Sequence, residues 1–232
     1  MSKSLRVGAA LLLAVLAIWT VQHAALHQPL QLGAKPSAAP MAASQVTVNG
    51  EAPAPLDTPY AMVKIPERLP DFTLANREGK PTSISAWRGK SLILNFWATW
   101  CAPCRREIPI LESLDVQWKP QNVAVIGIAV DRRDEVLAFA AALHITYPLL
   151  IGEQDALDAA AAVGVDSPMF PFTVFTDRRG EVVAVFVGEL HRPQADLILS
   201  KVKDIDDDRI ALPAARRAIA AGLDTLNAHA AG

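Results

Sequence analysis

The chain contains two cysteines, Cys101 and Cys104, separated by Ala102 and Pro103. A disulfide across so short a loop restricts the unfolded chain by about 2 kcal/mol at most in the chain-entropy estimate, so it would stabilise the fold little. The pair is better suited to thiol–disulfide exchange, in which one thiolate attacks a partner disulfide and the second thiol releases the mixed intermediate. The spacing therefore favours redox chemistry.

Metal binding is the main alternative for the pair. A zinc half-site needs a second ligand pair, but the only histidines between residues 60 and 205 are His144 and His191, and they do not form one. Cuprous ion would bind the two thiols, yet no cluster of Met or His residues accompanies them in the sequence. We expect no metal, and no cofactor other than the redox-active Cys101–Cys104 pair itself.

A strand followed by a helix is predicted to position the cysteines. Residues 91–98 form a nearly continuous apolar run, which is typical of a strand buried on both faces of a sheet. Apolar residues at helical spacing follow, namely Ile108, Leu111 and Leu114. Cys101 thus lies at a helix N-terminus, where unpaired amides and the helix dipole favour the thiolate. It should be the exposed nucleophile, and Cys104, one turn further on, should be the resolving thiol.

The remainder of the predicted domain, residues 60–205, alternates strands with helices. Strands are predicted over 69–75, 123–130, 147–151, 172–176 and 181–187, and helices over 134–143, 156–163 and 193–202. The last two strands flank a turn at 177–180 and indicate a hairpin. This order predicts an α/β fold, a three-layer α/β/α sandwich around a mixed central sheet.

The N-terminal segment is predicted to direct the chain out of the cytoplasm. No Asp, Glu, Lys or Arg occurs from residue 7 to residue 34, and Lys3 and Arg6 precede this segment. About 20 mostly apolar residues suffice to cross a bilayer, so we predict a transmembrane signal-anchor over 1–27 with its basic end in the cytoplasm. A cleaved signal is the alternative. The proline-rich residues 28–59 are predicted to form an extended linker.

An exchangeable cysteine pair outside the cytoplasm implies a partner. Extracytoplasmic cysteines usually build structural disulfides, but two cysteines provide no such framework. Another protein must therefore keep this pair in one redox state. The 22 basic and 24 acidic residues of the chain nearly cancel, so charge gives no electrostatic case for nucleic-acid binding.

A C-terminal extension is predicted over residues 206–232. Asp206, Asp207 and Asp208 are expected to form a solvated acidic start to a last, Ala-rich helix over 209–228. The apolar stripe of this helix consists of Leu212, Ile219, Leu223 and Leu226. Such a stripe is expected to pack on its own domain, with docking of a partner as the alternative.

With these elements in place, the chain resembles the thioredoxin superfamily, and within it the membrane-anchored TlpA/ResA/CcmG(DsbE)-like thiol-disulfide oxidoreductases. The resemblance covers about residues 66–203. Its motifs are Asn95 through Pro109 around the cysteines, Pro70-Asp-Phe-Thr-Leu with Gly79-Lys, and Phe170-Pro171-Phe-Thr173 leading to Asp177. It implies a thioredoxin-like reductase, anchored by a single span in the inner (cytoplasmic) membrane, with its catalytic domain on the periplasmic side.

The resemblance also implies how a substrate is bound. Pro171 would lie in a cis-proline loop facing the disulfide, where the backbone of Phe170 can pair with an incoming substrate strand. Trp100 and Pro103 complete the predicted substrate-contacting set. Trp97 and Trp100 are expected mainly to pack around and shield the disulfide.

Cys104 needs a proton acceptor before it can attack the mixed disulfide. Thioredoxins carry a buried Asp on the strand beneath the cysteines, whereas this chain has Asn95, which cannot accept a proton. Glu107 is the nearest carboxylate in sequence that could serve, directly or through water. The group resembled here often has a glutamate with this role. A solvated helix glutamate is the alternative.

The implied substrate is apocytochrome c, whose haem-attachment cysteines must be reduced, and the runner-up is a copper-site protein. A membrane electron-transfer protein of the DsbD/CcdA type is expected to recharge the dithiol. Two functions of other kinds stay open. One is a copper chaperone that binds metal through the two thiols, and the other is a peroxidase, although the surroundings of a lone peroxidatic cysteine are missing.

Overall fold

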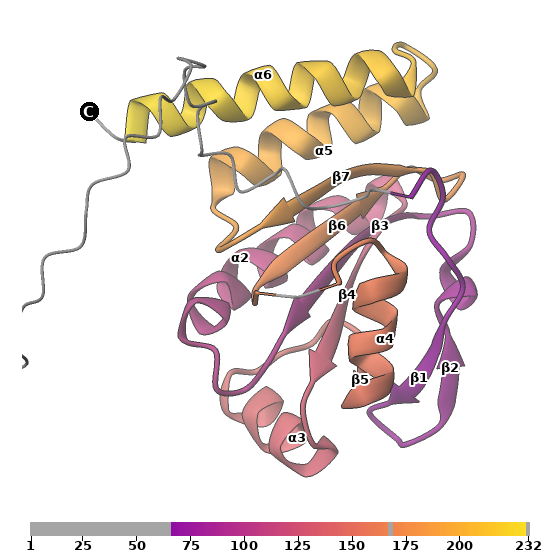
Figure 1. Ribbon diagram of the computed structural model, residues 1–232, viewed down its shortest axis with the longest axis vertical. Helices are drawn as coiled ribbons and strands as arrows, with labels where there is room; N and C mark the ends of the chain where they lie inside the picture. Colours follow the sequence, from indigo (N-terminus) through magenta and orange to yellow (C-terminus); the bar gives the residue numbers. More distant parts are fainter. Residues whose placement is uncertain (1–65, 167–168, 231–232) are drawn as a thin grey trace, which may run out of the picture. The chain divides into compact units, whose positions relative to one another are not determined.

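The computed structural model describes residues 66–166 and 169–230 (Figure 1). The predicted signal-anchor over 1–27, the linker over 28–59 and the first residues of the predicted domain lie outside these ranges. Within them, no helix has both the length and the apolar character needed to cross a bilayer.

Seven strands form one mixed sheet in the order β2-β1-β5-β4-β3-β6-β7. They are β1 Thr73–Asn76, β2 Pro81–Ser83, β3 Ser91–Trp97, β4 Val123–Val130, β5 Leu149–Gly152, β6 Phe172–Thr176 and β7 Val182–Val187. β3 lies inside the sheet, parallel to β4 and antiparallel to β6. All seven of its residues are buried, as the apolar run predicted.

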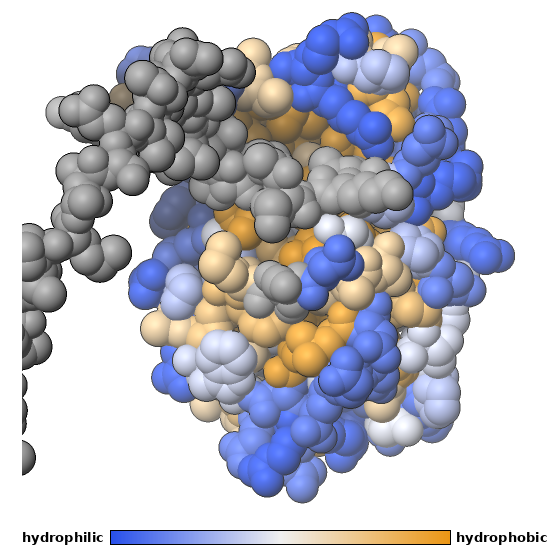
Figure 2. Space-filling model, in the orientation of Figure 1, coloured by the Kyte–Doolittle hydropathy of each residue, from blue (hydrophilic) through white to orange (hydrophobic). Residues whose placement is uncertain are grey.

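Helices cover both faces of this sheet. They are α2 Ala102–Trp118, α3 Arg133–Ala142, α4 Gln154–Ala162, α5 Arg192–Asp206 and α6 Leu212–Ala230, with the short 3-10 helices η1 Ile84–Trp87 and η2 Lys119–Gln121. α2, α3 and α5 contribute to the core on one face, and α4 and η1 to the core on the other. The predicted α/β/α layers are therefore confirmed. On the side shown in Figure 2, hydrophilic residues cover α3 and apolar residues gather toward the middle of the view.

The side chains of β3 supply both cores. Ile93 and Trp97 pack on the side of α2, whereas Leu94 and Phe96 pack on the side of α4. Successive side chains of a strand point to opposite faces, so a run that is apolar at nearly every position fills both cores. Asn95 shares the face of Ile93 and Trp97 and is fully buried. The alternation of side chains along β3 thus places the Asn95 amide beneath α2, the helix that carries the cysteines.

The first strand is shorter than predicted. It starts at Thr73 rather than at residue 69, because Leu69 donates its amide N–H to the Gly180 carbonyl beside the 177–180 turn, and Pro70 has no N–H to donate. The short strand β2, which the sequence did not predict, pairs with β1. Three residues that include Pro81 carry too little periodicity to be recognised as a strand.

The three aspartates do not start the last helix, so that prediction is wrong. Asp206 ends α5, and Asp207 and Asp208 lie in the turn before α6. α5 extends beyond the predicted residue 202 because Ile205 is buried and continues its apolar face. The carboxylates of Asp207 and Asp208 pair with the basic side chains of Arg178, Arg179, Lys203 and Arg209. Asp206 instead accepts hydrogen bonds from the Ser91 hydroxyl and the Arg178 amide N–H.

α6 packs on its own domain, as its apolar stripe predicted. Ile219 and Leu223 are buried, and the helix lies along α5 and contacts β7. The Arg216 guanidinium donates through Nε to the Val182 carbonyl of β7 at 3.2 Å. The extension therefore adds a helix to the α5 side of the fold.

Candidate active site

Cys101 and Cys104 form a disulfide with an S–S distance of 2.04 Å. Cys101 is the N-cap residue of α2, and the Cys104 amide N–H donates to Cys101 Sγ at 3.2 Å. The sulfur thus accepts one of the otherwise unpaired amides at the positive end of the helix, an arrangement that stabilises a thiolate after reduction. The predicted position of Cys101 at a helix N-terminus is confirmed.

The expected exposure of Cys101 is wrong for this oxidised form. Only 4% of the Cys101 surface is accessible, and Cys104 is fully buried. Both residues belong to the core that includes Trp97, which explains the low accessibility. The neighbours of Cys101 in the chain, Trp100 and Ala102, are exposed, so Cys101 lies just beneath the surface. Of the two cysteines, Cys101 remains the one that a partner disulfide can approach.

The loop before β6 lies at the same end of the sheet as the cysteines. Phe172 of β6 pairs with Phe96 of β3 in an antiparallel register, so the residues before β6 and those after β3 emerge together. The Phe170–Pro171 peptide bond is cis, as the resemblance implied. The Gly188 amide N–H donates to the Pro171 carbonyl at 2.9 Å, which ties this loop to the end of β7.

A series of aromatic rings connects this loop to the core. Phe96 stacks on Phe172 with ring centroids 4.4 Å apart, and Phe172 stacks on Phe170 at 6.2 Å. Phe170 then meets Trp100 edge to face at 6.0 Å. Contacts between rings at such distances add to the energy of area burial. They hold Phe170 beside the residue that precedes Cys101.

Two large apolar side chains near the disulfide are exposed. Trp100 is 72% exposed and Met169 is 70% exposed. Trp100 therefore does not shield the disulfide as expected, whereas Trp97 is fully buried in the core with the cysteines, as expected. Together with the half-buried Phe170 and Pro103, the exposed pair offers an apolar surface of the kind that binds polypeptides.

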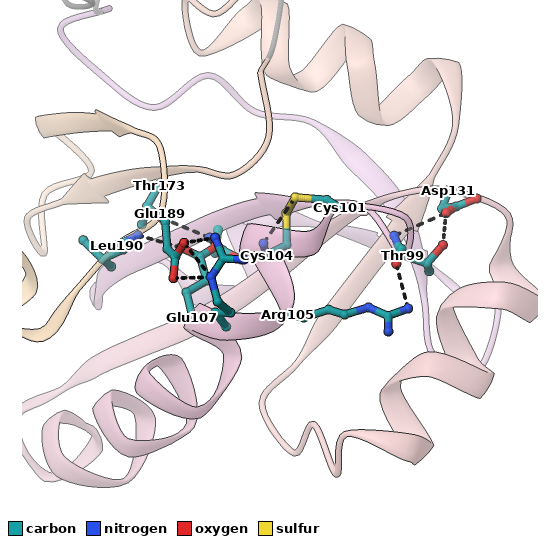
Figure 3. Close-up of a disulfide and its surroundings, with 11 residues drawn as sticks. Thr99, Cys101, Cys104, Arg105, Glu107, Asp131, Thr173, Glu189 and Leu190 are labelled. Carbon is teal, nitrogen blue, oxygen red and sulfur yellow. Dashed lines mark hydrogen bonds and ion pairs between the residues drawn. A yellow bond between two sulfur atoms is a disulfide. The ribbon is translucent and has the colours of Figure 1, made fainter.

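Glu107 lies on α2 and is fully buried (Figure 3). Its Oε1 accepts a hydrogen bond from Asn95 Nδ2 at 2.7 Å, and its Oε2 accepts one from the Leu190 amide N–H at 2.8 Å. Asn95 Nδ2 also donates to Thr173 Oγ1 at 3.0 Å. The alternative of a solvated glutamate is therefore wrong. Because Cys104 precedes Glu107 by three residues and is also buried, both side chains lie on the inner face of α2.

Burial raises the pKa of Glu107 to about 7, because loss of hydration disfavours the carboxylate. The hydrogen bonds from Leu190 and Asn95 favour the carboxylate and limit this rise, while the nearby negative charge of Glu189 adds to it. A carboxyl group with this pKa takes up and releases protons near neutral pH. Glu107 thus has the properties of a general acid and base.

The short connection between β3 and α2 is fixed from α3 and from the end of β4. Asp131, which follows β4, accepts hydrogen bonds from the Thr99 amide at 3.3 Å and from the Thr99 hydroxyl. Arg105 donates to the Thr99 carbonyl at 3.4 Å, and its guanidinium lies 5.0 Å from the centre of the Phe139 ring of α3. These contacts hold the cysteine loop from the side opposite to Glu107.

Several residues around the site were not predicted from the sequence. They are Arg106, Asp131, Met169, Thr173, Glu189 and Leu190. Thr173 and Met169 lie in or next to the Phe170-Pro171 motif, which was the available signal for them. The others contact residues that are 32 to 83 positions away in the chain, so only the packing of β4 and of the loop after β7 reveals them.

Comparisons with known proteins agree with this geometry. Residues 65–185 match the model of the AhpC/TSA family. The thiol-disulfide oxidoreductase ResA of Geobacillus kaustophilus (strain HTA426) is 33% identical over 147 residues, which cover 63% of this chain and 82% of the relative. The thioredoxin-like protein YneN of Bacillus subtilis (strain 168) is 33% identical over 134 residues, which cover 56% of this chain and 75% of the relative.

A solved structure extends the comparison to the fold. The secreted thiol-disulfide isomerase of Corynebacterium glutamicum is 26% identical, with a TM-score of 0.51, and the match covers 69% of this chain and 96% of that one. The segment matched by the family model contains Cys101, Cys104, Glu107 and Pro171. The chain belongs to the AhpC/TSA family of thioredoxin-like proteins and is a thiol-disulfide oxidoreductase of the ResA/DsbE type.

Proposed function

We propose that this enzyme works outside the cytoplasm as a reductase, passing two electrons from the Cys101/Cys104 dithiol to disulfides of exported proteins. The observation that carries the proposal is the arrangement on α2, where an N-cap sulfur, a buried second sulfur and the buried Glu107 carboxyl group follow one another. The direction of electron flow is the one that the resemblance implies. Nucleophile, resolving thiol and proton acceptor thus lie within two helical turns.

The exchange has two steps. The Cys101 thiolate attacks one sulfur of the substrate disulfide, which forms a mixed disulfide and releases the first substrate thiolate. Cys104 loses its proton and attacks Cys101 Sγ, which closes the Cys101–Cys104 disulfide and releases the second substrate thiolate. The substrate gains two electrons and the enzyme loses two, so another dithiol must reduce the enzyme before the next cycle.

Glu107 is the proposed acceptor of the Cys104 proton, directly or through one water molecule. With a pKa of about 7, roughly half of the Glu107 side chains are ionised at neutral pH, so the group accepts a proton during release and returns it when the enzyme is reduced again. The amide of Asn95 does not ionise. Its hydrogen bond to Oε1 instead orients the carboxylate.

The proposed substrate-binding surface consists of Trp100, Pro103, Phe170 and Pro171. An extended segment of the substrate would lie along Phe170 and form main-chain hydrogen bonds with it, as in strand addition. The Pro171 carbonyl is already bonded to the Gly188 amide, so the pairing with substrate falls to Phe170. The exposed Trp100 ring would contact apolar side chains that flank the substrate cysteine.

The proposed substrate is apocytochrome c, with a copper-site protein as the runner-up, and a DsbD/CcdA-type membrane protein is the proposed electron donor. Residues 1–27 would anchor the enzyme by a single span in the inner membrane, with the catalytic domain in the periplasm. The apolar N-terminal segment behind Lys3 and Arg6 supports this location. The similarity to ResA supports the activity.

A trapping experiment tests the activity and the substrate together. In the native host, the full-length Cys104→Ser variant should accumulate a mixed disulfide through Cys101, because release requires the second thiol. Dithiothreitol should release the captured protein from the adduct, and mass spectrometry should identify this protein as apocytochrome c. The Cys101→Ser/Cys104→Ser double variant is the matched control and should capture nothing. A copper-site protein in the adduct would favour the runner-up, and no adduct above the control would overturn the proposal.

A further inference from the structure

An ion pair joins α2 to the loop after β7 beside Glu107. Arg106 Nε lies 3.0 Å from each carboxylate oxygen of Glu189, and Arg106 Nη2 lies 2.5 Å from Glu189 Oε2. The next residue of the loop, Leu190, donates its amide N–H to Glu107 Oε2 at 2.8 Å. Two consecutive residues of α2 therefore bind two consecutive residues of one loop.

The geometry of this contact fixes the loop in direction as well as in distance. A guanidinium that engages both oxygens of a carboxylate holds its partner in one orientation. Figure 3 shows Glu189 and Leu190 meeting α2 together on the side of Glu107. At its start, the loop turns at Gly188, whose φ of 106° suits glycine, and whose amide is bonded to Pro171. The loop is thus held at both ends.

We propose that Arg106 and Glu189 are positioning residues for proton transfer at Glu107: their ion pair holds residues 188–190 on α2, so that the Leu190 amide N–H keeps donating to the Glu107 carboxylate. This inference deepens the proposed function and rests on Glu107 as the proton acceptor. It assigns a role to two residues that do not themselves exchange protons or electrons.

The exposure of the ion pair speaks against a purely structural role. The Arg106 side chain is 61% exposed and that of Glu189 is 18% exposed, and an ion pair with one side chain this open to water contributes modestly to stability. The hydrogen bond that the pair holds in place, from Leu190 to Glu107, is buried and acts in a surrounding of low dielectric constant. Loss of the pair should therefore affect the chemistry more than the fold.

The groups that face Glu107 come from several elements. They are Cys104 on α2, Asn95 on β3, Glu189 in the loop and Tyr147 before β5. Burial raises the pKa of the Tyr147 phenol, so this group stays neutral in the range where Glu107 titrates. Glu189 is the charged member of the set. The Arg106 guanidinium offsets the negative charge of Glu189. Without this partner, the Glu189 charge would disfavour ionisation of the Glu107 carboxyl group.

Arg106→Gln should slow the release step. The variant leaves the Glu189 charge uncompensated and lets the Leu190 amide move away, and both changes disfavour the Glu107 carboxylate. Release of the mixed disulfide at pH 7 should slow about fivefold, as expected if the pKa of Glu107 rises by about one unit and the ionised fraction falls from roughly half to roughly a tenth. The first attack by Cys101 should keep its rate.

Two further variants separate the held loop from the charge. The double variant Arg106→Gln/Glu189→Gln has no uncompensated charge at residue 189, but its loop 188–190 still lacks the ion pair to α2. Its release rate should therefore lie between those of wild type and Arg106→Gln. Lys203→Gln is the matched control, because it breaks a surface ion pair, with Asp207 at the end of α5, whose side chains are 44% and 35% exposed. It should leave both steps unchanged. If Arg106→Gln does not fold, Arg106→Lys keeps the charge without the forked geometry and should show a smaller slowing.

A titration of Glu107 provides a readout that is independent of activity. In the oxidised enzyme both cysteines are bonded and do not titrate, so the ¹³C-carboxyl signal of Glu107 can be followed by NMR from pH 5 to pH 9. Its midpoint should rise by about one unit in Arg106→Gln. An unchanged midpoint with an unchanged release rate would overturn the inference and leave the proposed function intact. If Glu107→Gln itself releases substrate at the wild-type rate, the proposed role of Glu107 fails instead.

Discussion

Glu107 connects the stability of this protein with its chemistry. The side chain is fully buried, yet it ionises near neutral pH because Asn95 and Leu190 donate hydrogen bonds to its two oxygens. The folded protein therefore binds a proton at Glu107 far more tightly than the unfolded chain does. Loss of the proton from Glu107, the same event that suits it to proton transfer, therefore lowers the stability of the folded protein.

The pH dependence of unfolding should show this cost. Between about pH 4.5 and pH 7 the folded state keeps the Glu107 proton and the unfolded chain has released it, so rising pH favours unfolding. The proton on Glu107 contributes about 3 kcal/mol to the free energy of unfolding. This contribution is fully present below pH 4.5 and is lost as the pH rises past the folded-state pKa of Glu107. Urea unfolding of the oxidised protein at pH 5 and pH 8 measures it. Glu107→Gln should lack this part of the difference, and an identical pH dependence in both proteins would contradict the expectation.

The same variant tests the chemistry at Glu107. Glutamine keeps the size of the side chain but cannot accept the Cys104 proton, so release should slow by roughly tenfold or more while the first attack changes little. The substitution is expected to be tolerated, because the buried Asn95 Oδ1 has no hydrogen-bond partner among the described residues and can turn to accept from the new amide. Stopped-flow tryptophan fluorescence with a model disulfide resolves the two steps. Equal slowing of both would remove the proton-transfer role.

At the scale of elements, the junction of β3 and α2 determines where the cysteines lie. β3 has neighbours on both sides, and its partners β4 and β6 each carry a segment that contacts the cysteine loop. Asp131, after β4, binds Thr99, and Phe170, before β6, contacts Trp100. Strand pairing thus brings three separate parts of the chain to one end of the sheet. By contrast, α6 contacts α5 and β7.

This difference predicts that α6 acts on stability and not on exchange. Leu223 is 5% exposed and packs in the core shared with α5, so Leu223→Ala should cost about 2 to 4 kcal/mol of unfolding free energy. Thr225 follows Leu223 by two residues and lies on the exposed face of α6. The unfolding free energy of Thr225→Ala should therefore stay within about 0.5 kcal/mol of wild type. Urea unfolding measures both. At pH 7 the exchange rate with a model disulfide should be unchanged, and a large loss of rate in Leu223→Ala would show that α6 supports the site.

At the scale of the whole molecule, the described residues form one thioredoxin-like domain. The N-terminal residues 1–59 are predicted to determine the cellular location of this domain. Among the described residues, the domain has a core on each face of the sheet. The predicted anchor would restrict the enzyme to the membrane surface, and a linker of 32 residues, 28–59, would let the disulfide reach both a membrane donor and an exported substrate.

Fractionation of the native host tests this arrangement. The full chain should stay in the membrane pellet after an alkaline carbonate wash, because about 20 apolar residues suffice to span the bilayer. A variant without residues 1–27 should appear in the soluble fraction. In spheroplasts, a maleimide that does not cross membranes should label reduced Cys101, which would place the catalytic domain outside the cytoplasm. Release of the full chain by carbonate would instead favour a cleaved signal.

Local sequence patterns alone determined much of this protein. The cysteine pair, the buried strand before it and the helix after it are encoded within about 25 consecutive residues, and β4 and β6 have the predicted bounds, because hydrophobic periodicity reports which residues are buried. The tertiary structure alone decided that Cys101 is nearly buried, that Glu107 is bound by Asn95 and Leu190, and that Arg106 holds the loop after β7. The hydration, charge and accessibility of a side chain depend on neighbours up to 83 residues away, and these meet only when sheet, helix and loop pack together.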